Sequence, residues 1–234
     1  MTAAKRFYKQ ALVVPEGGKF RIHLDSRPVR TPAKAILELP SEKAAIAVAA
    51  EWQAQGDKVN PLTMPFTRLA NTAIDRVSAG RDFVVDELCR YGASDLICYR
   101  AEGPDKLVAR QAAGWDGLLA WLRDAYGVEL KVTTGILYVD QEAGDMARLR
   151  LIVEGFDDFM LVGLHHATTL AGSFVIGLAL AAGHLAAPEA AALSSIDERF
   201  QAEIWGEDAE ITERLRRQAA DLAAAAEFIG FFRG

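Results

Sequence analysis

Residues 35–55 read AILELPSEKAAIAVAAEWQAQ, and within this stretch the hydrophobic pattern changes its period. Ala35 to Leu39 is a short apolar run typical of a strand. Ser41 then offers a helix N-cap, with Glu42 in the first turn, and the residues that follow predict a helix to about Gln55. This switch near residue 40 indicates an α+β protein in which the strands come first.

The residues before the switch predict a small antiparallel sheet. Phe20, Ile22 and Leu24 alternate with polar residues, which is the period of a half-buried strand. Further apolar runs, separated by turn signals, cover residues 7–14, 29–31 and 35–39. We expect three or four short strands joined by tight turns.

After Pro65 nearly the whole chain has a helical pattern. The expected helices cover residues 66–79, 81–92, 105–126, 145–163, 168–184, 188–204 and 208–230. Two short runs, 96–100 and 130–139, look β-like, and the second fits either a hairpin against the helices or an extra strand of the N-terminal sheet. The predicted domains are residues 1–62, β-rich with one helix, and residues 63–234, mainly α-helical.

The composition excludes several classes of protein. The chain has 234 residues, is 51% hydrophobic and 25% charged, and carries a net charge of −6. It is therefore globular, and its negative charge argues against nonspecific nucleic-acid binding, which needs a basic face. Cys89 and Cys98 have no CxxC companion, so we expect reduced core thiols. Met1 to Phe7 shows no apolar core of a signal peptide.

Residues 159–188 contain no Asp, Glu, Lys or Arg, which raises the question of a membrane span. The stretch holds three histidines and several hydroxyl side chains, and its flanks lack the basic and aromatic anchors of a membrane helix. We therefore expect a protein that is not membrane-embedded, in which the helix at about 168–184 is the most buried. Ala171, Gly172, Gly177 and Ala181 suit close helix contacts there.

A search for catalytic motifs finds none that is specific. The sequence has no phosphate loop, no dinucleotide fingerprint and no HExxH metal motif. His165 and His166 are adjacent, so on a helix they point about 100° apart and do not readily share a metal. Ser173 lacks the surroundings of a nucleophile elbow. We expect no cofactor, no metal, no nucleotide requirement and no enzymatic activity.

The segment 195–213, SIDERFQAEIWGEDAEITE, is the most unusual part of the chain. From Asp197 to Glu213 it has seven acidic residues and one base, a net charge of −6, so the rest of the chain sums to zero. On a continuous helix Glu203, Glu207 and Glu210 would lie within or beside an apolar stripe. Because burying an unpaired carboxylate is costly, either Gly206 breaks the helix or this face meets a partner.

Two other uses of these acids remain open from the residues alone. Glu203 could close an internal salt bridge, to Arg68 or Arg76. Alternatively Glu203, Glu207, Asp208 and Glu210 could bind a metal in a hydrolase, although no His or Cys lies in the segment. Trp205 among the acids is more typical of an interaction anchor.

Two further segments are unusually rich in charge and proline. Residues 24–34 place Arg27, Arg30 and Lys34 in a strand-turn-strand with two prolines, and residues 65–77 place several polar side chains on adjoining helical turns. Turn chemistry and local helix pairs explain both segments equally well.

At this point the sequence resembles a known family, the ATP-twelve family of F-type ATP synthase assembly chaperones. The likeness covers almost the whole chain in order, and its most specific part is Asp197 to Glu210. The matching stretches are 6–9, 24–34, 51–52, 64–77, 115–116, 172–173 and 195–210. Ser26 stands where a glycine is expected, and Gly117 where a proline is expected.

The resemblance implies a small N-terminal β-rich domain, a larger α-helical domain and a non-catalytic role. Such a chaperone binds the free alpha subunit and shields its beta-facing surface until assembly. A subunit that remains in the finished synthase is a further alternative. The implied location is the bacterial cytoplasm, or the mitochondrial matrix for a eukaryotic mature form. The expected contact residues are Asp197, Glu198, Phe200, Gln201, Glu203, Trp205, Glu207, Asp208 and Glu210, with Arg27, Arg30 and Lys34 as a second contact.

Overall fold

The computed structural model describes residues 5–233, so Met1 to Ala4, within the stretch considered as a signal peptide, lie outside it. Contacts divide the chain into two compact units, each described by itself below. The N-terminal unit comprises Met1–Arg81, Asp158–Val162 and Glu227–Gly234, and the helical unit comprises Asp82–Asp157 and Gly163–Ala226. The chain therefore returns twice to the N-terminal unit, at Asp158 and at Glu227.

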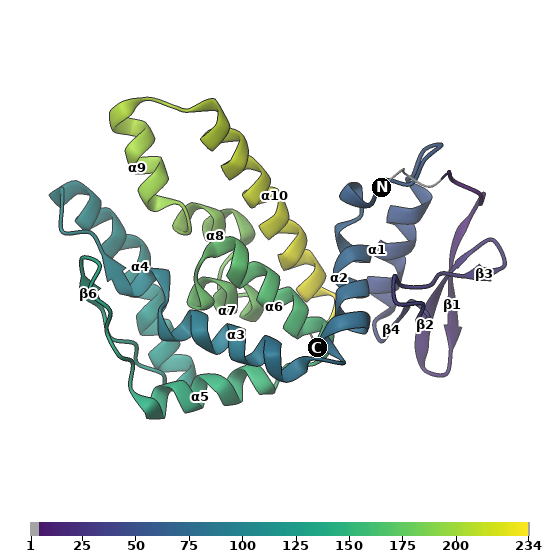
Figure 1. Cartoon of the computed structure of the whole chain (residues 1–234), viewed down its shortest axis with the longest axis horizontal. Helices are drawn as coiled ribbons and strands as arrows, with labels where there is room; N and C mark the ends of the chain where they lie inside the picture. Colours follow the sequence, from purple (N-terminus) through teal and green to yellow (C-terminus); the bar gives the residue numbers. More distant parts are fainter. Residues whose placement is uncertain (1–4, 234) are drawn as a thin grey trace. The chain divides into compact units, whose positions relative to one another are not determined.

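A four-stranded antiparallel sheet forms one side of the N-terminal unit (Figure 1). The strands are β1 (Ala11–Glu16), β2 (Lys19–Leu24), β3 (Arg27–Pro28) and β4 (Glu38–Leu39). β2 is central and pairs with all three others, with Val13 opposite Ile22 in the longest ladder. The predicted alternation is confirmed, because Ile22 and Leu24 are buried while Lys19 is exposed.

Helix α1 (Glu42–Gln53) covers the sheet, and it begins where the sequence predicts. The Ser41 side chain accepts a hydrogen bond from the amide of Ala44, which satisfies one of the free N–H groups at the helix start. Small buried residues on one side of the helix, Ala45 and Ala49 among them, allow close approach to β1 and β2. The fold is therefore α+β, as expected.

Two short elements complete this unit: η1 (Pro61–Thr63) and α2 (Pro65–Thr72), which continues as a π-helical turn, η2 (Ala73–Val77). The Glu51 carboxylate accepts hydrogen bonds from the amides of Phe66 and Thr67 at 2.7 and 2.8 Å, so it caps α2 from α1. Aromatic rings of the last residues pack here as well, with Phe228 stacked on Phe66.

Within the described residues, the helical unit contains eight α-helices, one 3-10 helix and a two-stranded sheet, and three of the α-helices also include residues of the N-terminal unit. They are α3 (Arg81–Ala93), η3 (Leu96–Cys98), β5 (Tyr99–Arg100), α4 (Asp105–Tyr126), β6 (Thr133–Thr134), α5 (Ala143–Glu154), α6 (Asp158–Ala171), α7 (Phe174–Ala182), α8 (Ala187–Leu193), α9 (Ile196–Trp205) and α10 (Ala209–Gly230). β5 and β6 pair in parallel. The 130–139 run thus forms neither a hairpin nor a strand of the N-terminal sheet.

Three predicted helices are in fact pairs of helices. The 145–163 prediction covers α5 and the start of α6, and the 188–204 prediction covers α8 and most of α9. The predicted helix 168–184 is divided between the end of α6 and α7. Helix α6 ends before Gly172, which has a φ of +66°, and Ser173 is the N-cap of α7. Apolar residues run through each break, so the hydrophobic pattern did not reveal it.

Helix α7 is the centre of the helical unit. Every residue from Phe174 to Ala181 is buried, and the helix contacts α4 and α8. No helix in the described range 5–233 is long and apolar enough to cross a membrane. The charge-free stretch is therefore divided between α6 and the core helix α7.

Gly177 lets α7 approach α6 closely. A Cβ added there would lie 2.9 Å from the backbone nitrogen of Thr168 and closer still to its hydroxyl oxygen. Gly117, on α4, has no atom within 4 Å of the corresponding position.

These two glycines predict opposite responses to the same substitution. Gly177→Ala should lower the free energy of unfolding by about 1–3 kcal/mol, because the helices must separate. Gly117→Ala should leave it unchanged or raise it by up to about 1 kcal/mol, through helix propensity alone. Urea unfolding of both variants checks this, and equal effects would show that the close approach is unimportant.

Asp95 joins η3 to α7 inside the helical unit. Its carboxylate is fully buried and accepts hydrogen bonds from the amides of Val175 (2.9 Å) and Ile97 (3.2 Å). Burial nevertheless raises the pKa of Asp95 from 3.8 to about 6, and these hydrogen bonds oppose the rise. The folded protein therefore holds this proton more tightly than the unfolded chain does.

This shift predicts a pH dependence of stability. Protonated Asp95 contributes stability below pH 4, and that contribution is lost as the pH rises through about 6. Relative to Asp95→Asn, the wild type should lose about 3 kcal/mol of unfolding free energy between pH 4 and 7. Urea unfolding of both proteins at four pH values measures the difference, and a flat or rising difference would contradict the assignment.

Candidate functional site

The acidic segment, residues 195–213, forms the whole of α9, a link and the start of α10 (Figure 1). Helix α9 ends at Trp205 because Gly206 adopts φ +93° and ψ +159°, a conformation that L side chains rarely adopt. The apolar stripe from Ile196 to Ile211 is therefore not continuous. Of the two explanations offered by the sequence, the helix break at Gly206 is the one that the structure shows.

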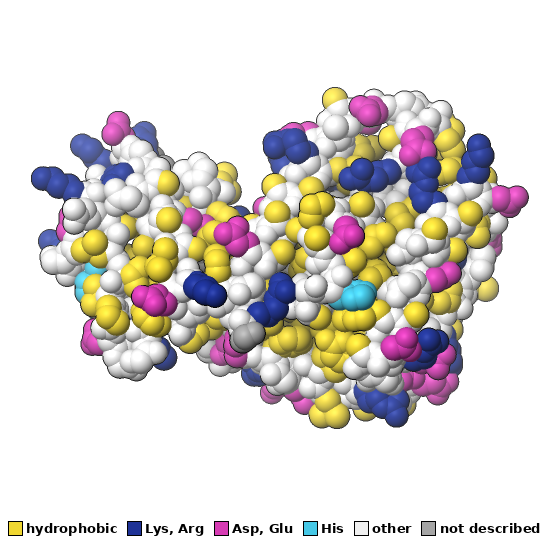
Figure 2. Space-filling view, turned by 180° about the vertical axis from the view of Figure 1, so that it is seen from behind, with side chains coloured by type: hydrophobic (Ala, Val, Ile, Leu, Met, Phe, Trp, Pro, Cys, Tyr) yellow, Lys and Arg dark blue, Asp and Glu magenta, His cyan; other side chains and the backbone are white. Residues whose placement is uncertain are grey.

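A groove of about 1110 Å³ lies between α9 and α10, with α4 and α8 contributing to its lining. Small residues, including Ala202 and Ala219, line it. A Cβ on Gly114 of α4 would lie 2.8 Å from the Ile196 side chain, so this glycine lets α9 approach α4 closely. Figure 2 shows the hollow at the upper right, with basic side chains at its edge.

Three of the predicted contact residues serve the fold itself. Asp197 accepts a hydrogen bond from the Gln111 side chain at 2.7 Å. Phe200 is only 6% exposed and packs in the core. The Asp208 carboxylate accepts hydrogen bonds from the amides of Glu210 and Ile211, at 2.7 and 3.1 Å, and so caps α10.

Glu203 forms a two-pronged ion pair with Arg110 of α4. The two nitrogen–oxygen distances are 2.7 and 2.8 Å, and the guanidinium also lies over the Phe200 ring at 5.3 Å. Hydrogen bonding to Arg110 lowers the pKa of Glu203. The internal partner is thus Arg110, and neither Arg68 nor Arg76 as the sequence suggested.

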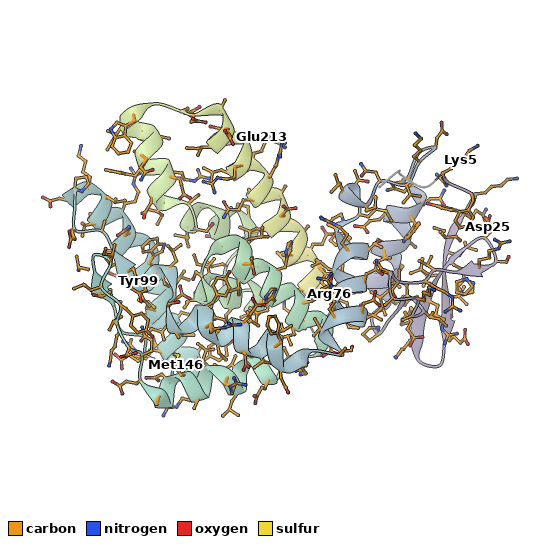
Figure 3. All side chains as sticks on the ribbon, viewed as in Figure 1. Lys5, Asp25, Arg76, Tyr99, Met146 and Glu213 are labelled. Atoms are coloured by element: carbon orange, nitrogen blue, oxygen red, sulfur yellow. The ribbon has the colours of Figure 1, made fainter. Side chains whose placement is uncertain are left out.

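Two more acids of the segment are also paired. Glu198 binds Arg214 at 3.2 Å, which connects α9 to α10. Glu213, labelled in Figure 3, binds Arg216 and Arg217 at 2.7 Å each. These hydrogen bonds lower the pKa of Glu213 to about 2. Three of the seven acids of residues 197–213 therefore form ion pairs within the protein.

The remaining exposed residues gather where α9 meets α10. Trp205 is 78% exposed and Ile204 is 54% exposed. Glu207 and Glu210 are exposed and form no ion pair with any residue of the described chain. We call these four residues, together with the 38%-exposed Ile211, the tip. Gln201 is exposed on the groove beside them.

The structure gives no support to the hydrolase alternative. Within residues 5–233, no group of three or more His, Cys, Asp or Glu side chains is arranged to hold a metal ion. Glu203 and Asp208 already bind Arg110 and the α10 amides. His165 instead lies 3.0 Å from Glu87.

The predicted second contact lies in the N-terminal unit. Arg27 belongs to β3, and Arg30 and Lys34 belong to the connection to β4. Asp75 of η2 accepts hydrogen bonds from the Thr31 hydroxyl (2.5 Å) and the Ala33 amide (2.9 Å). The two polar segments singled out in the sequence are thus bonded to each other.

Arg110 and Ile204 are not among the site residues predicted from the sequence. Arg110 lies 93 residues before Glu203, and only the packing of α4 against α9 brings the two together. Ile204 lies one residue before the end of α9 at Trp205, and its side chain is exposed there.

Comparisons with known proteins agree with this architecture. The chain is 26% identical over 220 residues to "Protein atp12, mitochondrial" of Schizosaccharomyces pombe, which covers 86% of this chain and 74% of that protein. The crystal structure of Atp12 from Paracoccus denitrificans matches with a TM-score of 0.94 and 41% identity, over 98% of this chain and 99% of that one. A mutant of P. denitrificans Atp12p gives the same score and identity.

A family model also matches the chain. It is described as "ATP12 chaperone protein" and covers residues 5–123, which is half of the chain and ends before the tip. Together with the full-length likeness to the P. denitrificans structure, this match shows that the chain belongs to the ATP12 chaperone family.

Proposed function

We propose that this chaperone binds the free alpha subunit of the F-type ATP synthase and shields its beta-facing surface until assembly, without catalysis. Membership of the ATP12 chaperone family supports the role. The observation that supports a binding site at the tip is the 78% exposure of Trp205 beside the carboxylates of Glu207 and Glu210, which form no ion pair in the described chain.

The tip has the chemistry of an interaction anchor. A tryptophan that becomes buried on binding supplies much of the affinity of many interfaces, and the charges around it set orientation and encounter rate. Glu207 and Glu210 have no internal partner, so they are available to basic groups of the client. An alpha subunit outside its ring exposes apolar surface that drives aggregation, and a chaperone must cover it reversibly.

Glu203 has a different part in this proposal. Its carboxylate is held by Arg110, yet the pair is 57% and 40% exposed, so a client cation can reach it. Contact with the client then exchanges one exposed ion pair for another. Such an exchange changes the free energy little and favours release as much as binding.

The first test is direct binding. Purified chaperone and free alpha subunit should form a one-to-one complex on a sizing column, and added beta subunit should release the chaperone. Trp205→Ala and the pair Glu207→Lys/Glu210→Lys should each weaken binding by about tenfold or more, without a change in thermal midpoint. No complex with the wild type would overturn the proposed function.

A matched control uses an exposed acid of the same unit away from the groove. Glu129→Lys makes the same charge change per site on the helical unit and should bind alpha as the wild type does. A complex that retains the chaperone in the presence of beta would instead favour a constituent of the synthase. Micromolar ATP–magnesium binding in a calorimetric titration would favour a nucleotide-dependent enzyme.

The Arg110–Glu203 pair allows a charge-swap experiment. Glu203→Lys should weaken binding to alpha at low salt by about tenfold, because attraction becomes repulsion. Its thermal midpoint should change little, because the pair is exposed. The double variant Arg110→Glu/Glu203→Lys restores an internal pair of opposite polarity. Its binding should remain weak if Glu203 contacts alpha, whereas full recovery would make the pair purely structural.

A further inference from the structure

The two units carry opposite net charges. The N-terminal unit has 14 Lys and Arg against 9 Asp and Glu, whereas the helical unit has 12 against 23. Outside residues 197–213 the net charge of the chain is zero. The N-terminal unit has five more bases than acids, and the helical unit without residues 197–213 has five more acids than bases. Figure 2 shows basic side chains along the outer edge of the N-terminal unit, at the left.

Part of this excess lies on one short segment. Arg27, Arg30 and Lys34 are all exposed, and none forms an ion pair within the described part of the chain. We call these three residues the basic turn. Arg30 donates a hydrogen bond to the backbone oxygen of Lys34 at 2.8 Å, so the two lie side by side.

The nearby carboxylates are engaged elsewhere. Asp25, labelled in Figure 3, accepts hydrogen bonds from the amides of Lys9 and Gln10. Asp75 binds Thr31 and Ala33, and Glu38 binds Lys19 and Arg21. Each acid serves the fold, and the three cations of the basic turn remain uncompensated.

The basic turn is also held in a fixed conformation. The Thr31 amide donates a hydrogen bond to the backbone oxygen of Ala35 at 2.9 Å, and the Lys34 amide donates one to the backbone oxygen of Thr31 at 2.8 Å. The hydrogen bonds to Asp75 attach the turn to η2. Lys34 adopts φ +70°, which a lysine rarely does. The Arg30 guanidinium is also held by its hydrogen bond to the Lys34 oxygen, and a guanidinium positioned in advance binds a carboxylate with less loss of conformational entropy.

We propose that the basic turn docks an acidic segment of the client protein. Three cations within eight residues match a short run of carboxylates. A nucleic acid is the poorer fit, because the 23 acids of the helical unit repel a long polyanion. The proposal extends the proposed function: the tip takes basic groups of the client and the basic turn takes acidic ones.

The test uses two triple variants with the same change in net charge. Arg27→Gln/Arg30→Gln/Lys34→Asn neutralises the basic turn, and asparagine tolerates the positive φ at position 34. Lys9→Gln/Lys43→Gln/Lys58→Gln neutralises three other exposed lysines of the same unit. Thermal midpoints establish that both variants are folded.

The first probe is a fluorescent deca-glutamate peptide, measured by anisotropy at low salt. The wild type and the lysine control should bind it alike, and the basic-turn variant about tenfold or more weakly. No binding by the wild type, equal losses in both variants, or tighter binding of a 20-nucleotide DNA strand would overturn the proposal.

The second probe is the free alpha subunit. The basic-turn variant should bind it more weakly than the lysine control, with a smaller dependence on salt. If wild-type protein binds alpha and both variants match it, this inference fails while the proposed function stands. If wild-type protein does not bind alpha, the proposed function fails, and the peptide measurement alone decides on the basic turn.

Discussion

The helical unit depends on surrounding one helix that has no polar side. α7 buries every residue from Phe174 to Ala181, so each direction around it must be covered by another apolar surface. α4 and α8 cover two of these directions, and α4 in turn contacts α9. The buried Asp95 and the Ser173 cap satisfy the amides at the start of α7, which no solvent reaches. The tip is therefore connected to this buried core through the contacts of α9 with α4 and of α4 with α7.

The same packing determines which acids of residues 197–213 are free. α4 presents Gln111 to Asp197 and Arg110 to Glu203, and α10 presents Arg214 to Glu198. Pairing within the protein leaves Glu207 and Glu210 at the link, where no neighbouring helix reaches them. A segment that looks uniformly acidic in sequence thus contains three ion-paired acids, two acids hydrogen-bonded to neutral groups, and two acids beside Trp205 with neither kind of partner in the described chain.

Local signals in the sequence predicted the fold well where they were specific. Ser41 marks the start of α1 as expected, and the predicted helix 105–126 coincides with α4 because a glycine in the left-handed region follows it. The breaks at Gly172 and after α8 were missed, since apolar residues continue through them. The sequence predicted which segment contains the candidate site, but not which of its side chains are exposed and free to bind a partner. Long-range partners such as Arg110 carry no periodic signal, so the division into paired and free acids needed the structure.

In the complex proposed above, in which Trp205 and Glu203 contact the alpha subunit, reversibility follows from this division. Replacing the Arg110–Glu203 ion pair by an ion pair between Glu203 and a basic group of the client changes the free energy little. Ionic contacts at Glu203 therefore contribute more to specificity than to affinity. Burial of Trp205 supplies roughly 3 kcal/mol, or about a hundredfold in affinity, and it requires only a complementary apolar pocket. A competitor that covers the same client surface removes that pocket, and the remaining exposed ion pairs are too weak to retain the complex. Release of this kind needs no hydrolysis step, because the competing subunit provides the free energy.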